Sequence, residues 1–202
     1  MALKPPRVGV FGGAFDPPHD AHVSLVKAAL AQLGLARLHI LPTGDAWHKA
    51  RGLSAGHHRL EMARLAFEGL PGAVVDDREL RRAGPTYTLD TLRELRGEQP
   101  AAELVLILGA DQASSLPRWH GWQDILAMAV VAVAQRPGAG AFDPLALPGA
   151  PPGARFETLA ITPMDVSATE IRAKAALGQD LSRLVPPAVA RYIDQHHLYR
   201  TT

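Results

Sequence analysis

Residues 7–22 read RVGVFGGAFDPPHDAH, and this stretch decides the fold. A short apolar run, residues 7–11, ends in Gly12-Gly13, which predicts a buried strand entering a tight turn. Apolar residues then recur at helical spacing over residues 22–33, at Val23, Val26, Leu30 and Leu33. Strand, glycine turn and helix in direct succession form the first half of a strand–helix–strand unit.

The rest of the chain repeats this alternation. Strands are predicted at 38–41, 73–75, 104–108, 130–134 and 156–161, and helices at 54–67 (capped by Ser54), 88–95, 125–127, 167–177 and 187–196, with a loop at 136–153. Strands that alternate with helices imply right-handed crossovers and a parallel sheet. We therefore expect an α/β fold: a Rossmann-like doubly wound parallel sheet with helices on both faces and a small helical C-terminal segment.

Composition narrows the class of protein. The 202 residues suit one domain, 1–202, whose C-terminal helical part covers about 163–202. A net charge of +1 does not suggest a surface that binds nucleic acid, and the absence of cysteine excludes disulfides. The longest apolar run, residues 125–134, is too short to span a bilayer, and no signal peptide is visible. Cytoplasmic location is the default expectation, and a homo-oligomer stays open.

Ligands on doubly wound sheets bind beyond the carboxyl ends of the strands. Two segments fall there, residues 12–22 and 109–111. Gly12 and Gly13 let a backbone approach a ligand, and the free N–H groups at the next helix start favour a phosphate. His19 and His22, three apart, can point the same way and hydrogen-bond a phosphorane as its charge develops. The alternative is a loop whose histidines cap backbone groups.

A second phosphate site is predicted at residues 166–172, VSATEIR. Ser167 and Glu170 have the spacing of a helix capping box, which alone would be a structural feature. Thr169 and Arg172 lie one turn apart on the same helix. Hydroxyls, N–H groups and a guanidinium together make a clamp for a polyphosphate.

Both stretches resemble known motifs. Residues 12–22 resemble the GGTFDPxHxGH signature of a nucleotidyltransferase family, and residues 166–172 resemble the same family's phosphate-binding element near the C-terminus. This resemblance implies a Rossmann-like sheet and transfer of a nucleotidyl group from a nucleoside triphosphate. Ala14 stands where the family usually has Thr, and Ala21 where it has Gly.

Further segments resemble the bacterial nicotinate-nucleotide adenylyltransferases. They are Leu41-Pro42 followed by His48-Lys49, residues 87–92, residues 108–111 followed by 116–119, and residues 192–200. The resemblance implies that the chain binds ATP and nicotinate mononucleotide and joins them in NAD biosynthesis. It implies ATP contacts for Gly12, Gly13, His19, His22, Asp111, Ser167, Thr169 and Arg172, and substrate contacts for His48, Lys49, Tyr87, Thr88 and Trp119.

Four of these residues also have a plainer explanation. Trp119 offers a flat surface on which a pyridinium ring can stack, or it is a core residue, a role we expect for Trp122. Thr88, with nearby backbone N–H groups, receives the nicotinate carboxylate or caps a helix. Asp111 bonds ribose hydroxyls or caps a helix. Lys49 balances phosphate charge or lies in solvent.

The expected mechanism is in-line attack of the mononucleotide phosphate on the α-phosphorus of ATP, with His19, His22 and Arg172 as catalytic residues. Mg²⁺ is expected to arrive on the triphosphate, and no metal is expected on the protein, since the adjacent pairs His57-His58 and His196-His197 should point apart. Phosphopantetheine adenylyltransferase, a regulator without turnover and a preference for nicotinamide mononucleotide stay open as alternatives.

Overall fold

The computed structural model describes residues 4–44, 52–135, 142–144 and 147–200. Its centre is a six-stranded sheet in the order β3-β2-β1-β4-β5-β6, and every neighbouring pair is parallel. The strands are β1 (Arg7–Gly13), β2 (Leu35–Pro42), β3 (Ala73–Val75), β4 (Glu103–Gly109), β5 (Ala129–Gln135) and β6 (Phe156–Ala160). This order is that of a doubly wound sheet, so the predicted fold class is confirmed.

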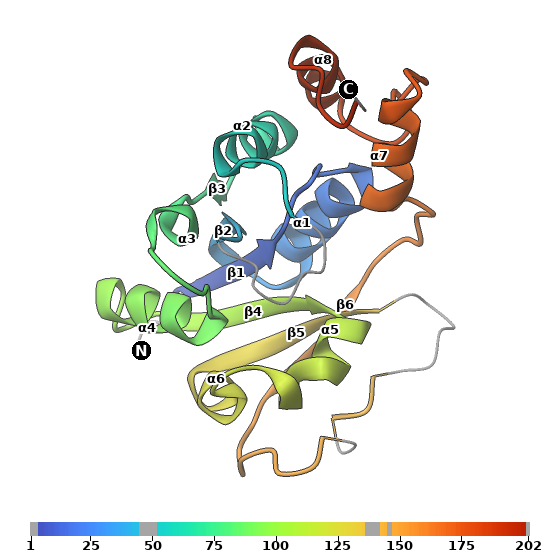
Figure 1. Cartoon of the computed structure of the whole chain (residues 1–202). Helices are drawn as coiled ribbons and strands as arrows, with labels where there is room; N and C mark the ends of the chain where they lie inside the picture. The colour runs from blue at the N-terminus through green and yellow to red at the C-terminus, as the bar shows by residue number, and fades with distance from the viewer. Residues whose placement is uncertain (1–3, 45–51, 136–141, 145–146, 201–202) are drawn as a thin grey trace.

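Helices cover both faces of the sheet (Figure 1). The first layer holds α1 (Asp20–Gln32), α2 (Gly56–Phe67), α7 (Ala168–Ala176) and α8 (Pro187–Gln195). The second holds α4 (Thr88–Glu98), α5 (Ala110–Ser115), the short 3-10 helix η1 (Leu116–Arg118) and α6 (Trp122–Met128). A four-residue helix, α3 (Arg78–Arg81), precedes α4.

The central strands are apolar because both of their faces are buried. In β4, Val105 and Ile107 face the first layer, while Leu104 and Leu106 face the second. Side chains alternate between the two faces of a strand, so a strand covered on both sides reads as a continuous apolar run. The same reasoning explains the uninterrupted apolar run of β5.

Several predicted boundaries were wrong. Helix α1 begins at Asp20 with His19 as its N-cap, not at His22. Ser54 does not cap α2, because Ala55 is the N-cap; the Ser54 N–H instead donates to Asp16. Trp122, expected in the core, is only half-buried at the start of α6. Helix α3 was not predicted, since four residues are too few to show a period.

The carboxyl ends of β1 and β4 lie side by side in the sheet. The chain runs from β1 outward through β2 to β3, and then returns to place β4 on the other side of β1. The direction of winding therefore reverses between β1 and β4, and ligands of doubly wound sheets bind at such a point, outside the carboxyl ends of the strands. Gly12 and Gly13 end one of these strands and Gly109 ends the other.

Candidate functional site

The turn after β1 leaves open space above the sheet. A Cβ added to Gly12 would have only the Leu41 carbonyl oxygen within 4.0 Å. A Cβ on Gly13 would lie 3.0 Å from the ring of Phe15, which is buried and has a φ of 47°. The left-handed backbone at Phe15 folds this ring back under the turn. A ligand can therefore approach the main chain at Gly12, while Gly13 makes room for the ring.

His19 and His22 stack on each other at the start of α1. Their ring centroids are 3.7 Å apart with an interplanar angle of 25°. The His22 Nδ1 accepts a hydrogen bond from the His19 backbone N–H at 3.2 Å. A neutral imidazole whose Nδ1 accepts must carry its proton on Nε2. The three-residue spacing thus brings both rings together, with the His22 Nε2–H as a donor.

Burial determines the charge of His19. The residue is 8% exposed, and desolvation lowers its pKa to about 4. The His19 Nδ1 is buried and has no hydrogen-bond partner within the described residues. An imidazole that stays neutral at pH 7 lies here in a medium of low dielectric constant, where a hydrogen bond is electrostatically stronger than in water.

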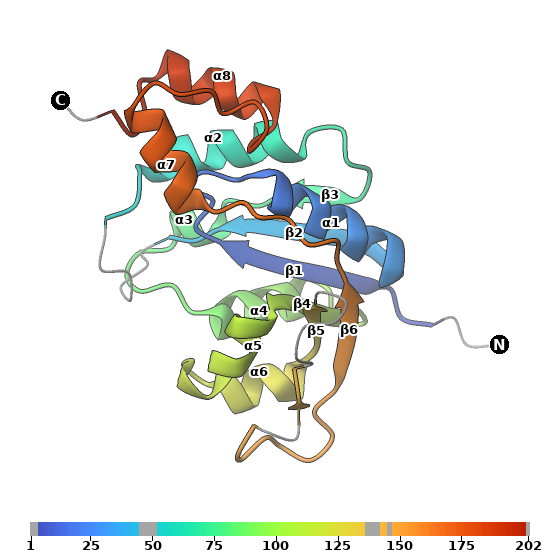
Figure 2. The same ribbon diagram turned by 90° about the vertical axis from the view of Figure 1, so that its right-hand side faces the viewer.

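Helix α7 brings the second motif to the same turn (Figure 2). Ser167 is the N-cap of α7, and its Oγ accepts from the Glu170 N–H at 3.2 Å. The Arg172 guanidinium donates to the carbonyl oxygen of Asp16 at 2.8 Å and to the Thr169 Oγ1 at 3.1 Å. The two predicted phosphate motifs, 156 residues apart at this contact, therefore form one site.

Three polar residues in this site had no role assigned from the sequence. They are Asp16 and Arg59, 2% and 3% exposed, and Tyr199, whose hydroxyl donates to the Asp16 carboxylate at 2.8 Å. Asp16 and Tyr199 stand inside the motif stretches quoted above, so the sequence held a signal for them. Arg59 had none, because a single arginine on a predicted helix usually lies in solvent.

A second group of predicted residues meets at the start of α4. Tyr87 is the N-cap of α4, so the alternative that Thr88 caps this helix is wrong. The ring of Tyr87 lies 4.4 Å from that of His120, the neighbour of Trp119. Trp119 is half-buried, packs on the second layer and donates from Nε1 to the Ser115 Oγ at 3.3 Å. His120 was missed, since nothing in its sequence context marks it.

Of the remaining predicted residues, Asp111 lies exposed in the first turn of α5. The N-cap there is Gly109, so the alternative that Asp111 caps the helix is wrong. His48 and Lys49 lie outside the described residues.

The described part of the chain offers no metal cluster of three histidine or acidic side chains. The expectation that His57 and His58 point apart is wrong, because their ring centroids are 4.0 Å apart. The His58 ring also lies 5.3 Å from that of His196. Within the same residues, no helix is long and apolar enough to cross a bilayer.

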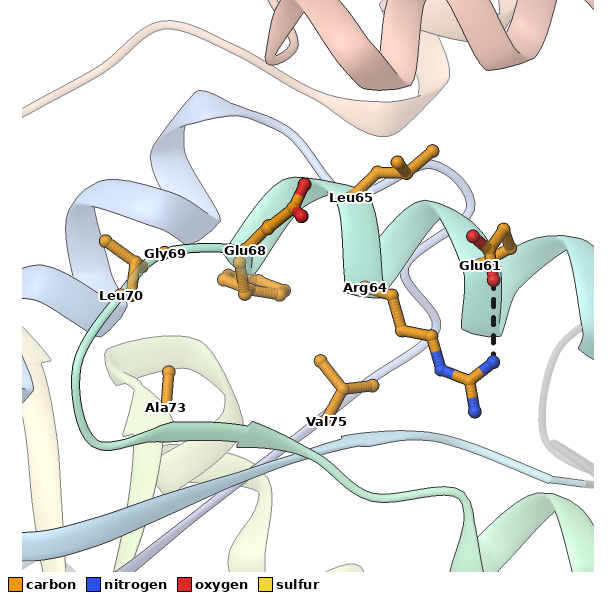
Figure 3. A pocket seen from close by; sticks show the side chains of 9 residues that line it. Glu61, Arg64, Leu65, Glu68, Gly69, Leu70, Ala73 and Val75 are labelled. Atoms are coloured by element: carbon orange, nitrogen blue, oxygen red, sulfur yellow. Dashed lines mark hydrogen bonds and ion pairs between the residues drawn. The ribbon is translucent and has the colours of Figure 1, made fainter.

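One surface hollow, of about 360 Å³, lies away from this chemistry. It is lined by the last turns of α2 and by β3, with Arg64 bonded to Glu61 at 3.5 Å (Figure 3). Ala73, at the amino end of β3, contributes to its wall. The hollow is thus at the outer edge of the sheet, whereas the candidate site lies at the carboxyl ends of the central strands.

Comparisons with known proteins agree with this geometry. The family model described as cytidylyltransferase-like matches residues 10–174. A probable nicotinate-nucleotide adenylyltransferase of Albidiferax ferrireducens is 55% identical, covering 96% of this chain and 98% of the relative. One from Methylibium petroleiphilum is 42% identical, with 96% and 92% covered.

Solved structures show the same fold. The Plasmodium falciparum nicotinic acid mononucleotide adenylyltransferase in complex with NaAD superimposes with a TM-score of 0.76 at 19% identity, covering 96% of this chain and 97% of that one. From motifs, fold and relatives together, the chain belongs to the cytidylyltransferase-like family and, within it, to the nicotinate-nucleotide adenylyltransferases.

Proposed function

We propose that the protein transfers AMP from ATP to nicotinate mononucleotide and releases pyrophosphate. A phosphate oxygen of the mononucleotide forms a bond to the α-phosphorus, and the bond from that phosphorus to the bridging oxygen of the β-phosphate breaks. The products are nicotinate adenine dinucleotide and pyrophosphate. One observation carries the proposal: Arg172 of the second motif bonds the Asp16 carbonyl within the first, so a triphosphate can contact both motifs at once.

The residues of this site position the reacting phosphates and stabilise the charge that develops on them, and they form no covalent intermediate. We assign His19, His22 and Arg172 to the charge that develops on the α-phosphate, because donors held in fixed positions stabilise such charge without reorganising. The remaining ATP contacts are assigned to Gly12 and Gly13 in the turn, Ser167 and Thr169 at the start of α7, and Asp111 beside the β4 end. Mg²⁺ enters as part of the substrate, bound to the triphosphate.

The acceptor is assigned to the start of α4. Trp119 would stack on the pyridine ring, and Tyr87, Thr88 and the N–H groups of the first turn would receive the nicotinate carboxylate. His48 and Lys49 complete the assignment as contacts of the mononucleotide, on sequence alone. Cytoplasmic location, a homo-oligomer and the absence of nucleic acid among the partners stay predictions.

The test is pyrophosphate release from Mg·ATP, run in parallel with nicotinate mononucleotide, nicotinamide mononucleotide and phosphopantetheine. We expect strong release with the nicotinate form alone. Release with phosphopantetheine instead would overturn the acceptor, and release with none of them would overturn the transfer reaction.

His19→Ala tests the assigned chemistry. We expect kcat to fall about a hundredfold or more, the usual effect of removing one charge-stabilising donor. The matched control is His57→Ala, which removes an exposed imidazole from the first turn of α2 and should leave kcat unchanged. A folded His19→Ala variant with more than half of the wild-type kcat would contradict the role.

A further inference from the structure

A buried carboxylate lies at the centre of the phosphate site. Its two oxygens have separate partners: Oδ1 accepts from the Tyr199 hydroxyl at 2.8 Å, and Oδ2 accepts from the Ser54 N–H at 3.2 Å. The main-chain carbonyl of the same residue, Asp16, accepts from Arg172. A carboxylate removed from water is costly unless its oxygens are bonded. These contacts therefore join four segments of the chain at one residue: the turn after β1, the segment before α2, helix α7 and the segment after α8.

Arg59 holds two of these segments together, the turn after β1 and the segment before α2. It is 3% exposed, and its Nε donates to the Ser54 carbonyl at 2.9 Å while its NH1 donates to the Ala14 carbonyl at 3.0 Å. The negative charge of Asp16 favours the charged form of this guanidinium, although burial lowers its pKa overall. Asp16, Arg59, Arg172 and Tyr199 form what we call the Asp16 cluster.

Tyr199 comes from the opposite end of the chain. It follows α8, and its backbone has a φ of 67°, a left-handed conformation that is unfavourable for a residue with a side chain. Such strain persists only where surrounding contacts hold it. Burial and the nearby Asp16 charge raise the pKa of Tyr199, so its hydroxyl keeps the proton that it donates to Asp16.

We propose that Tyr199 is a positioning residue: its hydroxyl orients Asp16, and through Asp16 it places the turn that carries His19 and the guanidinium of Arg172 around the triphosphate. The C-terminal segment therefore completes the ATP site without touching the reacting atoms. This inference rests on the proposed function for its substrate, and on the Asp16 cluster for its geometry.

A purely structural role would behave differently. If the Tyr199 hydroxyl only anchored the end of the chain, its loss would lower the melting temperature and leave the kinetics of the folded enzyme unchanged. If it positions the turn, catalysis falls in a protein that is still folded, because small misplacements of aligned groups can cost up to a hundredfold in rate.

The test is Tyr199→Phe, which keeps the ring and removes only the hydroxyl. We expect kcat/KM for ATP to fall about tenfold or more at 25 °C, with a melting temperature that stays well above the assay temperature. Tyr192→Phe is the matched control: its hydroxyl bonds His58 at 3.0 Å, between α8 and α2, and its removal should leave kcat/KM within twofold of wild type. A Tyr199→Phe enzyme within twofold of wild type would overturn the proposal, as would an equal loss in Tyr192→Phe.

A double-mutant cycle with Asp16→Ala, which removes both acceptor oxygens, shows whether the effect passes through Asp16. We expect the double variant to match Asp16→Ala alone, since the hydrogen bond can be lost only once. If the losses in kcat/KM of the two single variants multiply in the double variant, the effect of Tyr199 does not pass through Asp16 and the proposed route is refuted.

Direct binding of Mg·ATP by calorimetry provides a second readout if Asp16→Ala does not fold. Tyr199→Phe should weaken that binding about threefold or more, and unchanged affinity together with unchanged kinetics would refute the inference. A wild-type protein that binds ATP but releases no pyrophosphate would refute the proposed function. The binding comparison would still decide the role of Tyr199.

Discussion

Glu79 is an acid buried under α4, and it makes stability depend on pH. It is 6% exposed, and the Thr91 hydroxyl donates to its Oε1 at 2.8 Å. Arg82 donates to the Thr91 Oγ1 and to the Glu94 carboxylate, and its charge lowers the pKa of Glu79 by less than burial raises it. Desolvation is the main cause that raises the pKa of Glu79 from 4.5 to about 7. The acid is therefore held in a site that favours its neutral form.

The size and sign of the effect follow from linkage. Below pH 4.5 both folded and unfolded states hold the proton, so Glu79 has no effect on stability. Between pH 4.5 and 7 the unfolded state releases the proton first, so the free energy of unfolding falls as the pH rises. Above pH 7 the whole penalty is present, about 3 kcal/mol at roughly 1.4 kcal/mol per pH unit, and about 2.5 kcal/mol of it develops between pH 5 and pH 8.

Glu79→Gln keeps an oxygen that can accept from Thr91 and removes the ionisation. We expect the difference in unfolding free energy between variant and wild type to shift by about 2.5 kcal/mol in favour of the variant from pH 5 to pH 8. In a chain of this length that is about 5–10 °C in melting temperature. Urea unfolding at both pH values measures it.

Glu68→Gln is the control for this measurement. Glu68 is exposed at the end of α2, so removing its charge should change stability by less than about 0.5 kcal/mol at either pH. If the Glu79→Gln difference is the same at pH 5 and pH 8 to within about 1 kcal/mol, the reasoning about the buried acid is wrong.

Two further predictions concern the acceptor and the backbone. Trp119→Ala should raise KM for nicotinate mononucleotide about tenfold, since stacking on an aromatic ring is worth roughly 1–3 kcal/mol; steady-state kinetics that show the same rise in KM for ATP would contradict the assignment. Gly44→Ala should lower the free energy of unfolding by about 1–3 kcal/mol, because its Cβ would press on the Glu79 carbonyl and lie 2.6 Å from the Thr86 Oγ1. The paired change Gly97→Ala, in α4 with open space around it, should raise that free energy by about 0.5–1 kcal/mol; urea melts that show the opposite order would refute both.

Sequence patterns predicted the parts of the site that depend on local spacing. The pairing of His19 with His22 follows from three residues at the start of a helix, and their rings do stack. The Ser167 cap followed from its spacing to Glu170, and the structure has it. The predicted Ser54 cap of α2 was wrong. The Ser54 N–H donates to the Asp16 carboxylate instead, so a tertiary contact overrode the local spacing rule.

Such patterns could not predict contacts between residues far apart in the chain. Tyr199 and Asp16 are separated by 183 positions, and no periodicity relates them. The burial of Arg59 depends on α2 packing over the turn after β1, which a single helical segment does not reveal. The contact of Tyr87 with His120 likewise needs the α4 start and the loop after η1 to meet.

By itself, the sequence determined the succession of strands and longer helices along the chain, the doubly wound class of sheet and the two phosphate motifs. These depend on hydrophobic periodicity and on groups a few residues apart, which act within one turn or one strand. Tertiary structure alone decided which ionisable groups are shielded from water. These are His19, which burial keeps neutral, the Glu79 carboxyl group, and the Asp16 carboxylate that accepts from Tyr199. Desolvation depends on everything that surrounds a group, so it is set only when distant segments pack together.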